Sequence, residues 1–195
     1  MSDRYIFRYI IILVVIVSVL LSGAALLLKP YQDKNIKNER RINILKAAGI
    51  TDVDNKNAEH LYKQHCTAEL LLNENGEIAD NGNLPVYIID DKISVFPMTG
   101  NGLWGPIWGY IGLSADFKTI VGAVFDHKSE TPGLGAEITS EGFQSQFSGK
   151  EMQQKGDKIS VEVDAIAGAT RTSDGVKDMI SNVLEAYKPY IERNE

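Results

Sequence analysis

The stretch LPVYIIDDKISVFPM, residues 84–98, decides the fold of this chain. Residues 84–89 and 93–98 are strand-like runs, and Asp90-Asp91 between them is typical of a short turn. Two strands joined by so short a turn pair in the antiparallel sense. The stretch therefore predicts a β-hairpin at the centre of an antiparallel sheet.

Further regular elements are expected on both sides of this hairpin. Strands are expected at 67–72, 110–113, 119–125 and 159–166, and helices at 31–48, 55–66, 143–147 and 174–192. The last helix has the clearest pattern, because its apolar residues recur at steps of three and four. Thr172 or Ser173 would cap it, and Gly49 would end the helix at 31–48. Helices beside an antiparallel sheet predict an α+β fold.

Residues 9–28 predict a membrane anchor. They are 20 consecutive uncharged residues, which span about 30 Å as a helix, the thickness of the hydrocarbon layer. A cleaved signal peptide is the alternative, but its apolar region is normally shorter. We expect Pro30 to close the span. The expected domains are an anchor segment at 1–30, a helical connector at 31–54 and a folded domain at 55–195.

The flanking charges leave the orientation of this anchor open. Arg4 and Arg8 precede the apolar run, whereas six basic residues follow it between Lys29 and Lys46. A plain positive-inside count would place the large domain in the cytoplasm, but that rule is weak for long translocated domains.

Composition excludes several classes of function. The net charge of −6 argues against a nucleic-acid partner. The lone Cys66 cannot form an internal disulfide, and His60 and His65 lack a third ligand nearby in sequence, so no metal site is expected. The chain has no Gly-x-Gly-x-x-Gly after a strand, so NADH is not expected to bind it.

The run DAIAGATRTS, residues 164–173, predicts a binding site. It places the hydroxyl of Thr170 just ahead of a helix N-terminus, where free backbone N–H groups and the helix dipole favour an anion. Small residues at 167, 168 and 169 would let a bulky group approach the backbone.

The glycine-rich segments 100–110 and 127–137 are the other candidates. The run Glu130-Thr-Pro-Gly-Leu-Gly135 predicts a tight loop with little steric bulk, for which a plain turn is the alternative. Trp104 and Trp108 are either core residues or a wall of a binding site. Glu130 would pair with Lys128 or accept hydrogen bonds from the loop.

These motifs resemble those of a known family. The run at 164–170 resembles the flavinylation motif Asp-x-x-Ser/Thr-Gly-Ala-Thr, although Ala167 stands where Ser or Thr is usual. Together with Gly-Leu-Trp104 and the loop at 130–135, it resembles NqrC, the C subunits of sodium-translocating NADH:quinone oxidoreductases, and in part their relatives RnfG.

The resemblance implies an FMN-binding domain in which the phosphate of FMN is esterified to Thr170. Asp164 then belongs to the signature that a flavin transferase reads. The residues expected to contact the cofactor are Gly168, Ala169 and Thr172 beside Thr170, and Trp104, Glu130, Thr131, Gly133, Leu134 and Gly135 around the ring.

The function implied is that of an electron carrier that is not active alone. It would work with other subunits of a sodium-pumping NADH:quinone oxidoreductase, anchored in the lipid of the inner membrane by one span, with its FMN domain on the periplasmic side. Two alternatives remain at this point: an RnfG-type FMN subunit of a ferredoxin-linked ion-translocating complex, and a non-redox anchored extracytoplasmic module.

Overall fold

A computed structural model describes residues 3–155 and 158–194 of the chain. The chain has two compact parts, one ending at Glu39 and the other beginning at Arg40, and each is described by itself. Helix α1, Asp3–Ala47, begins in the first part and ends in the second. The predicted domain bounds at 30 and 54 remain predictions.

The first part is one apolar helix. The segment Ile6–Ala47 of α1 is long and apolar enough to cross a membrane: its most apolar 18-residue window has a mean hydropathy of 3.1, and none of that window is buried. Length and composition are those of a membrane span.

The expectation of a separate helix at 31–48 after Pro30 is wrong, because α1 continues through Pro30 to Ala47. A proline inside a helix removes one hydrogen bond and costs about 3 kcal/mol. Many helical turns on either side offset that loss, so a long helix tolerates the residue. The stop at Gly49 is confirmed: its φ is +83°, its N–H donates to Lys46 O at 2.9 Å, and Ile50 N–H donates to Leu45 O at 3.0 Å.

The second part contains a five-stranded antiparallel sheet whose strands follow one another in chain order. They are β1, Cys66–Leu72; β2, Leu84–Ile89; β3, Ile93–Asn101; β4, Pro106–Leu113; and β5, Ile120–His127. In the turn between β2 and β3, Asp90 and Asp91 have φ of 51° and 58°, in the left-handed region, and Ile89 pairs with Ile93 across the turn. The predicted antiparallel α+β fold is confirmed.

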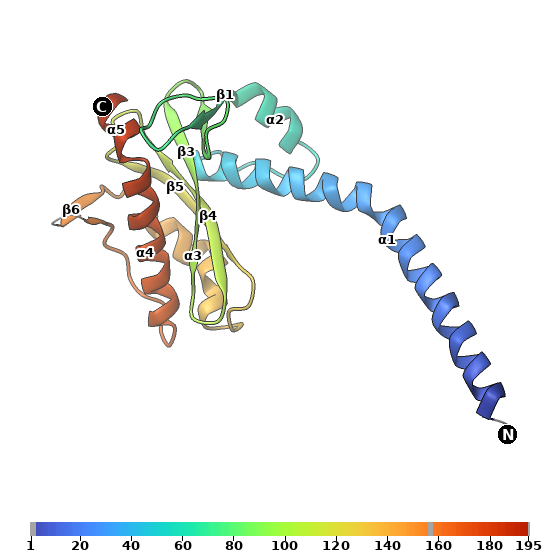
Figure 1. Cartoon of the computed structure of the whole chain (residues 1–195). Coiled ribbons are helices and arrows are strands. Elements are labelled where there is room, and N and C mark those ends of the chain that lie inside the picture. The colour runs from blue at the N-terminus through green and yellow to red at the C-terminus, as the bar shows by residue number, and fades with distance from the viewer. Residues whose placement is uncertain (1–2, 156–157, 195) are drawn as a thin grey trace. The chain divides into compact units, whose positions relative to one another are not determined.

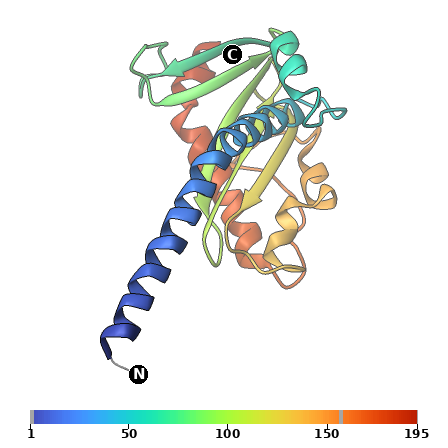
Figure 2. The same ribbon diagram turned by 90° about the vertical axis from the view of Figure 1, so that its right-hand side faces the viewer.

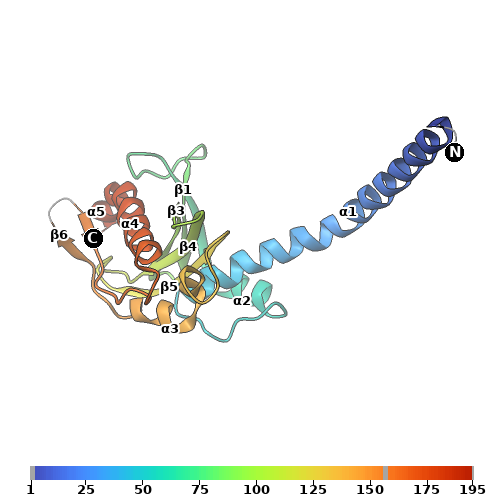
Figure 3. The same ribbon diagram turned by 90° about the horizontal axis from the view of Figure 1, so that it is seen from below.

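Helix α4, Thr170–Ala186, covers one face of the sheet (Figures 1 and 3). Val176 and Ile180 of the helix belong to one core cluster with Phe96, Ile107 and Ile111 of the strands. Figure 2 views the sheet from the other face, with α4 behind the strands.

The sequence predicts one C-terminal helix that reaches residue 192, but a separate helix α5, Lys188–Asn194, follows α4 after Tyr187. Pro189 lacks the N–H that would continue the hydrogen-bond ladder of α4. The ring of Tyr187 also packs on Phe96 with centroids 4.7 Å apart, and its hydroxyl donates to Pro85 O at 2.8 Å. Both features favour a break at this position.

The opposite face of the sheet is covered by the end of α1 and lies beside α2, Ala58–His65. Ile44 and Ala47 are buried there with Tyr87, Ile89 and Val95. At Gly112 of β4, a Cβ would lie 2.2 Å from Ala47 O, so this glycine allows the close approach of α1 to the sheet.

The segment between β5 and α4 contains only short elements. They are the 3₁₀ helix η1, Gly135–Thr139; α3, Glu141–Gln144; the 3₁₀ helix η2, Ser145–Phe147; and two strands, β6, Gln153–Lys155, and β7, Lys158–Ser160. The short helix expected at 143–147 is confirmed as α3 and η2. The strand expected at 159–166 is regular only as far as Ser160, because Asp164 N–H donates to the side chain of Gln146 rather than to a neighbouring strand.

Candidate functional site

Thr170 is the first residue of α4, and its side chain is exposed. The residue before it, Ala169, has φ −130° and ψ 36° and offers no side chain to cap the helix. The first backbone N–H groups of a helix have no partners within the helix. The exposed hydroxyl of Thr170 therefore stands at a helix N-terminus that no side chain at the cap position satisfies, which is an arrangement suited to a phosphate.

Thr172 and Ser173 do not cap the helix, and that prediction is wrong. Both lie inside α4 with buried side chains that point toward the rest of the fold. Ser173 Oγ accepts from Ile166 N–H at 3.0 Å and donates to Ala169 O at 3.1 Å. These bonds hold the turn at 166–169, in which Gly168 has φ +76°.

Glu130 is a buried carboxylate at the base of this site, with 4% of its surface exposed. Its Oε1 accepts from Trp104 N–H at 2.8 Å, and its Oε2 accepts from the Thr172 hydroxyl at 2.6 Å. The N–H of Glu130 donates to His127 Nδ1 at 3.2 Å. Neither alternative expected for Glu130 is found: its carboxylate accepts from Trp104 and Thr172, not from the 130–135 loop, and it is not paired with Lys128.

The segment after Glu130 is a tight loop, as the sequence predicts. Leu134 N–H and Ala136 N–H both donate to Thr131 O at 3.1 Å. Gly133 has φ +74°, and a Cβ there would meet nothing within 4 Å. Thr131, Gly133 and Leu134 are exposed whereas Gly135 is buried, so the loop offers an open rim above a closely packed base.

Large apolar side chains lie exposed on the segments that Glu130 joins. Trp104 is 66% exposed, Leu103 is 51% exposed and Leu134 is 41% exposed. The end of the Leu134 side chain reaches the turn before α4, because a Cβ at Gly168 would lie 2.9 Å from Leu134 Cδ2. An apolar surface thus adjoins the turn that leads to Thr170.

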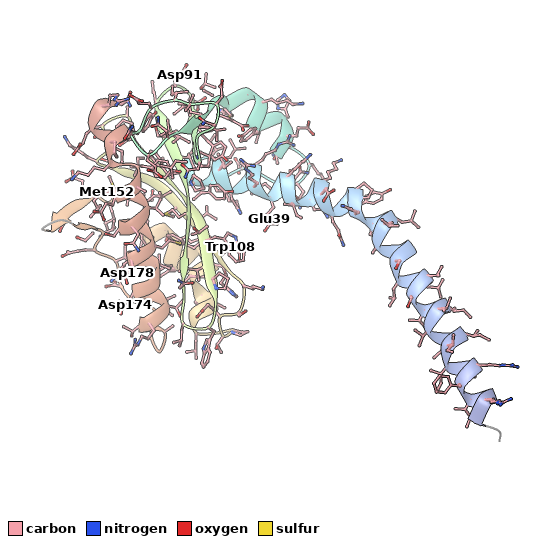
Figure 4. The ribbon with its side chains drawn as sticks, viewed as in Figure 1. Glu39, Asp91, Trp108, Met152, Asp174 and Asp178 are labelled. Carbon is pink, nitrogen blue, oxygen red and sulfur yellow. The ribbon has the colours of Figure 1, made fainter. Side chains whose placement is uncertain are left out.

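The two tryptophans differ in position. Trp104 lies between β3 and β4 and is not a core residue, which leaves a binding role for it. Trp108 is half-buried on β4, and by the alternation of side chains it faces the side of the sheet away from α4, together with Tyr110. Figure 4 agrees, with Trp108 on one side of the sheet and Asp174 and Asp178 on α4.

Asp164 lies outside this apolar surface. It is exposed at a groove of about 440 Å³ that Gln146, Lys150 and Lys177 also line.

The sequence analysis included Gly102 and Leu103 only as members of the 100–110 segment, without a role of their own, and it missed Gly175. A Cβ at Gly102 would lie 2.5 Å from Glu130 Oε1, and one at Gly175 would lie 2.4 Å from Asn101 O. The signals were present: three glycines between residues 100 and 105, and a glycine one turn after Thr172 on the inner side of a helix.

These residues fit an FMN. The uncapped helix N-terminus suits its phosphate, the small residues Ala167, Gly168 and Ala169 leave room beside the backbone, and exposed Leu134 and Trp104 offer apolar surface to the ring.

Comparisons with known proteins point the same way. Residues 102–185 match the model of a family described as an FMN-binding domain. The C subunit of the Na(+)-translocating NADH-quinone reductase of Haemophilus ducreyi is 27% identical, with 86% of this chain and 84% of that protein aligned. The C subunit of the same enzyme from Neisseria meningitidis serogroup B is 28% identical, with 98% and 95% aligned.

Two solved structures share the fold. The crystal structure of the C subunit of the Na(+)-translocating NADH-quinone reductase of Parabacteroides distasonis is 34% identical with a TM-score of 0.74, and the match covers 84% of this chain and 96% of that one. The NqrC of Shewanella oneidensis has a TM-score of 0.71 at 23% identity, over 80% and 96%. The matched interval 102–185 includes Trp104, the 130–135 loop and Thr170.

Proposed function

The chain belongs to the family of C subunits of Na(+)-translocating NADH-quinone reductases, and we propose that it relays electrons within such a complex through an FMN bonded covalently to Thr170. The observation that carries the proposal is the exposed Thr170 hydroxyl at an uncapped helix N-terminus, next to a turn that an exposed leucine contacts. FMN supplies the redox chemistry, and the chain supplies position and surroundings.

The bond to Thr170 would form by transfer from FAD, catalysed by a flavin transferase. Thr170 Oγ1 forms a bond to the phosphorus of the FMN half, the pyrophosphate bond of FAD breaks, AMP leaves, and the hydroxyl proton is released. Thr170 is accessible to such an enzyme because it is exposed, and Asp164 is exposed as well. We assign Asp164 to recognition by the transferase.

The other site residues would divide into two groups. The first-turn N–H groups of α4, with Gly168 and Ala169 before them, would hold the phosphate. Leu134, Trp104 and the rim of the 130–135 loop would contact the ring and exclude water from part of it. A phosphoester fixes only one end of the cofactor, so contacts at the ring are needed to hold it at a fixed distance from its electron partners.

Electrons would reach and leave this protein through its partners. The sequence carries no fingerprint for NADH binding, so the nicotinamide and the quinone would be handled by other subunits. We place the protein in the inner membrane by its N-terminal helix, with the second part on the periplasmic side.

The test is the intact mass of the protein purified from membranes of cells that contain the transferase. The parent should carry the mass of FMN minus water, and a tryptic peptide containing Thr170 should carry the same addition. Thr170→Val should lose the addition and the in-gel fluorescence of the flavin. Thr51→Val changes an exposed threonine far away in sequence and should keep both. Full labelling of Thr170→Val would refute the proposed attachment site.

A further inference from the structure

We propose that Glu130 is a positioning residue, whose buried carboxylate fixes the start of α4 and the β3–β4 turn in the arrangement that the flavin site requires. Its effect on the flavin rests on the proposed function, whereas the contact itself does not. Glu130 then acts through Thr172 and Trp104 and not by touching the ring.

Three segments of the site meet at this one side chain. Glu130 begins the 130–135 loop, its Oε1 accepts from the backbone of Trp104 in the β3–β4 turn, and its Oε2 accepts from Thr172 in the first turn of α4. Thr172 is 42 residues away from Glu130 in the chain, and 1% of its surface is exposed. The carboxylate therefore links segments that no covalent connection holds together.

The surroundings are built to admit this carboxylate. A Cβ at Gly102 would lie 2.5 Å from Oε1, and a Cβ at Gly135 would lie 2.4 Å from Oε2. Both distances are shorter than a van der Waals contact, so a side chain at either position would displace the carboxylate from its hydrogen bonds. Gly102 and Gly135 therefore both border the carboxylate of Glu130.

Stability alone does not explain a charge at this position. Glu130 is the one acidic or basic side chain among the buried residues of the described part of the chain, and no cation is paired with it there. Burying a carboxylate is unfavourable even when it is hydrogen-bonded, and an apolar side chain of similar size would serve a core better. Two charge-assisted hydrogen bonds give what apolar packing lacks: a fixed direction and distance between the joined segments.

The consequence for the cofactor follows from sequence proximity. Thr172 lies two residues after Thr170, where the phosphate would be attached, and Trp104 lies on the apolar surface where the ring would rest. If the carboxylate fixes Thr172 and the backbone of Trp104, it also fixes the two ends of the flavin relative to each other.

The first experiment needs no cofactor. In the Thr170→Val protein, which cannot carry the proposed ester, hydrogen exchange of the amides at 173–175 and 104 is compared between Glu130→Ala and the control Glu137→Ala, an exposed glutamate in η1. We expect at least about tenfold faster exchange in Glu130→Ala only, which corresponds to about 1.4 kcal/mol of lost protection. Equal exchange in the two variants would overturn the positioning role, whatever the fate of the proposed flavin site.

The second experiment uses the flavinylated protein. Glu130→Ala and Thr172→Val should each lower the fluorescence anisotropy of the attached flavin and shift its midpoint potential, and the double variant should show no more than the larger single effect, since both remove one link. Glu130→Gln, which can accept from Trp104 and donate to Thr172, should restore most of the parental anisotropy, as should Thr172→Ser.

Additive effects, or variants whose flavin matches that of Glu137→Ala, would contradict the inference. If the Glu130→Ala protein fails to fold, the comparison of Thr172→Val with Thr172→Ser decides the question. If the parent itself carries no flavin, the proposed function fails, and the exchange experiment still decides the role of Glu130.

Discussion

At Gly135, the side chain is limited to a hydrogen atom by two oxygens. A Cβ would lie 2.4 Å from Glu130 Oε2 and 2.7 Å from Thr172 Oγ1, both of which are buried. We expect Gly135→Ala to destabilise the protein by about 1–3 kcal/mol, because the hydrogen-bonded pair must move apart. Urea unfolding of the flavin-free protein measures this.

The same contact provides a control for Gly135→Ala. Removing the carboxylate makes room for the methyl group, so the loss in Gly135→Ala should be smaller when Glu130→Ala is already present. Equal losses in both backgrounds would mean that the carboxylate does not limit the size of residue 135.

Gly168 is constrained by its backbone conformation more than by its neighbours. Its φ of +76° lies in the left-handed region, which costs a residue with a Cβ about 1–2 kcal/mol, and its Cβ would meet only the flexible end of Leu134, at 2.9 Å. We expect Gly168→Val to abolish FMN attachment in the intact-mass assay, because it changes the turn before Thr170 and adds bulk there.

A matched change one position earlier tests the same idea. Ala167 is exposed, and Ala167→Ser restores the residue that the flavinylation motif usually has, so it should be flavinylated as fully as the parent. If Gly168→Val were labelled to the same extent as Ala167→Ser, close approach to the backbone at 168 would not matter to the transferase.

At the scale of elements, α4 and β3 come unusually close at Gly175. Alanine in a helix interior is normally about 1 kcal/mol more favourable than glycine. Here a Cβ would lie 2.4 Å from the backbone oxygen of Asn101, the last residue of β3, and a backbone cannot move aside as a side chain can. We expect Gly175→Ala to destabilise by about 1–3 kcal/mol instead.

Gly142 in α3 is the control for that prediction, because a Cβ there would meet nothing within 4 Å. Gly142→Ala should be neutral or stabilise by up to about 1 kcal/mol. Urea unfolding of both variants measures the change in the free energy of unfolding. If Gly175→Ala were stabilised as much as Gly142→Ala, α4 could move away from β3 with little loss of stability.

Most elements could be predicted from the sequence because their signals are local. The apolar runs of β2 and β3 and the apolar stripe of α4 appear within windows of a few residues. The helix boundary predicted at Pro30 was wrong because proline is a strong but not absolute helix breaker, and a long helix can contain one. The start of α4 could not be placed correctly because Thr172 and Ser173 resemble capping residues, whereas the fold uses their hydroxyls inside.

The candidate site could be predicted only in part for a related reason. Short motifs mark Thr170 and the 130–135 loop, but no pattern shows that Glu130 meets Thr172, since the contact depends on how α4 packs on the sheet. The sequence also did not predict that Trp104 is exposed. Tryptophan is buried on average, and the position of the turn that exposes this one depends on the tertiary structure.

At the scale of the whole molecule, the open prediction is which side of the membrane carries the folded part. The charge count favours the cytoplasm, with more basic residues after the apolar run than before it, whereas the proposed function favours the periplasm. Labelling with a membrane-impermeant thiol reagent in spheroplasts decides between them. Cys66 should first be changed to serine: burial raises the pKa of its thiol, so it would react slowly and give an ambiguous signal.

Two single cysteines then report on the two sides of the span. Glu185→Cys lies at an exposed position of α4, and Asp3→Cys lies before the apolar run without changing a basic residue. We expect Glu185→Cys to be labelled in intact spheroplasts and Asp3→Cys only after lysis. The reverse pattern would place the folded part in the cytoplasm. Both cysteines are placed in the same Cys66→Ser background. Labelling of both in intact spheroplasts would show that the membrane leaks, so only opposite results for the two cysteines decide the orientation.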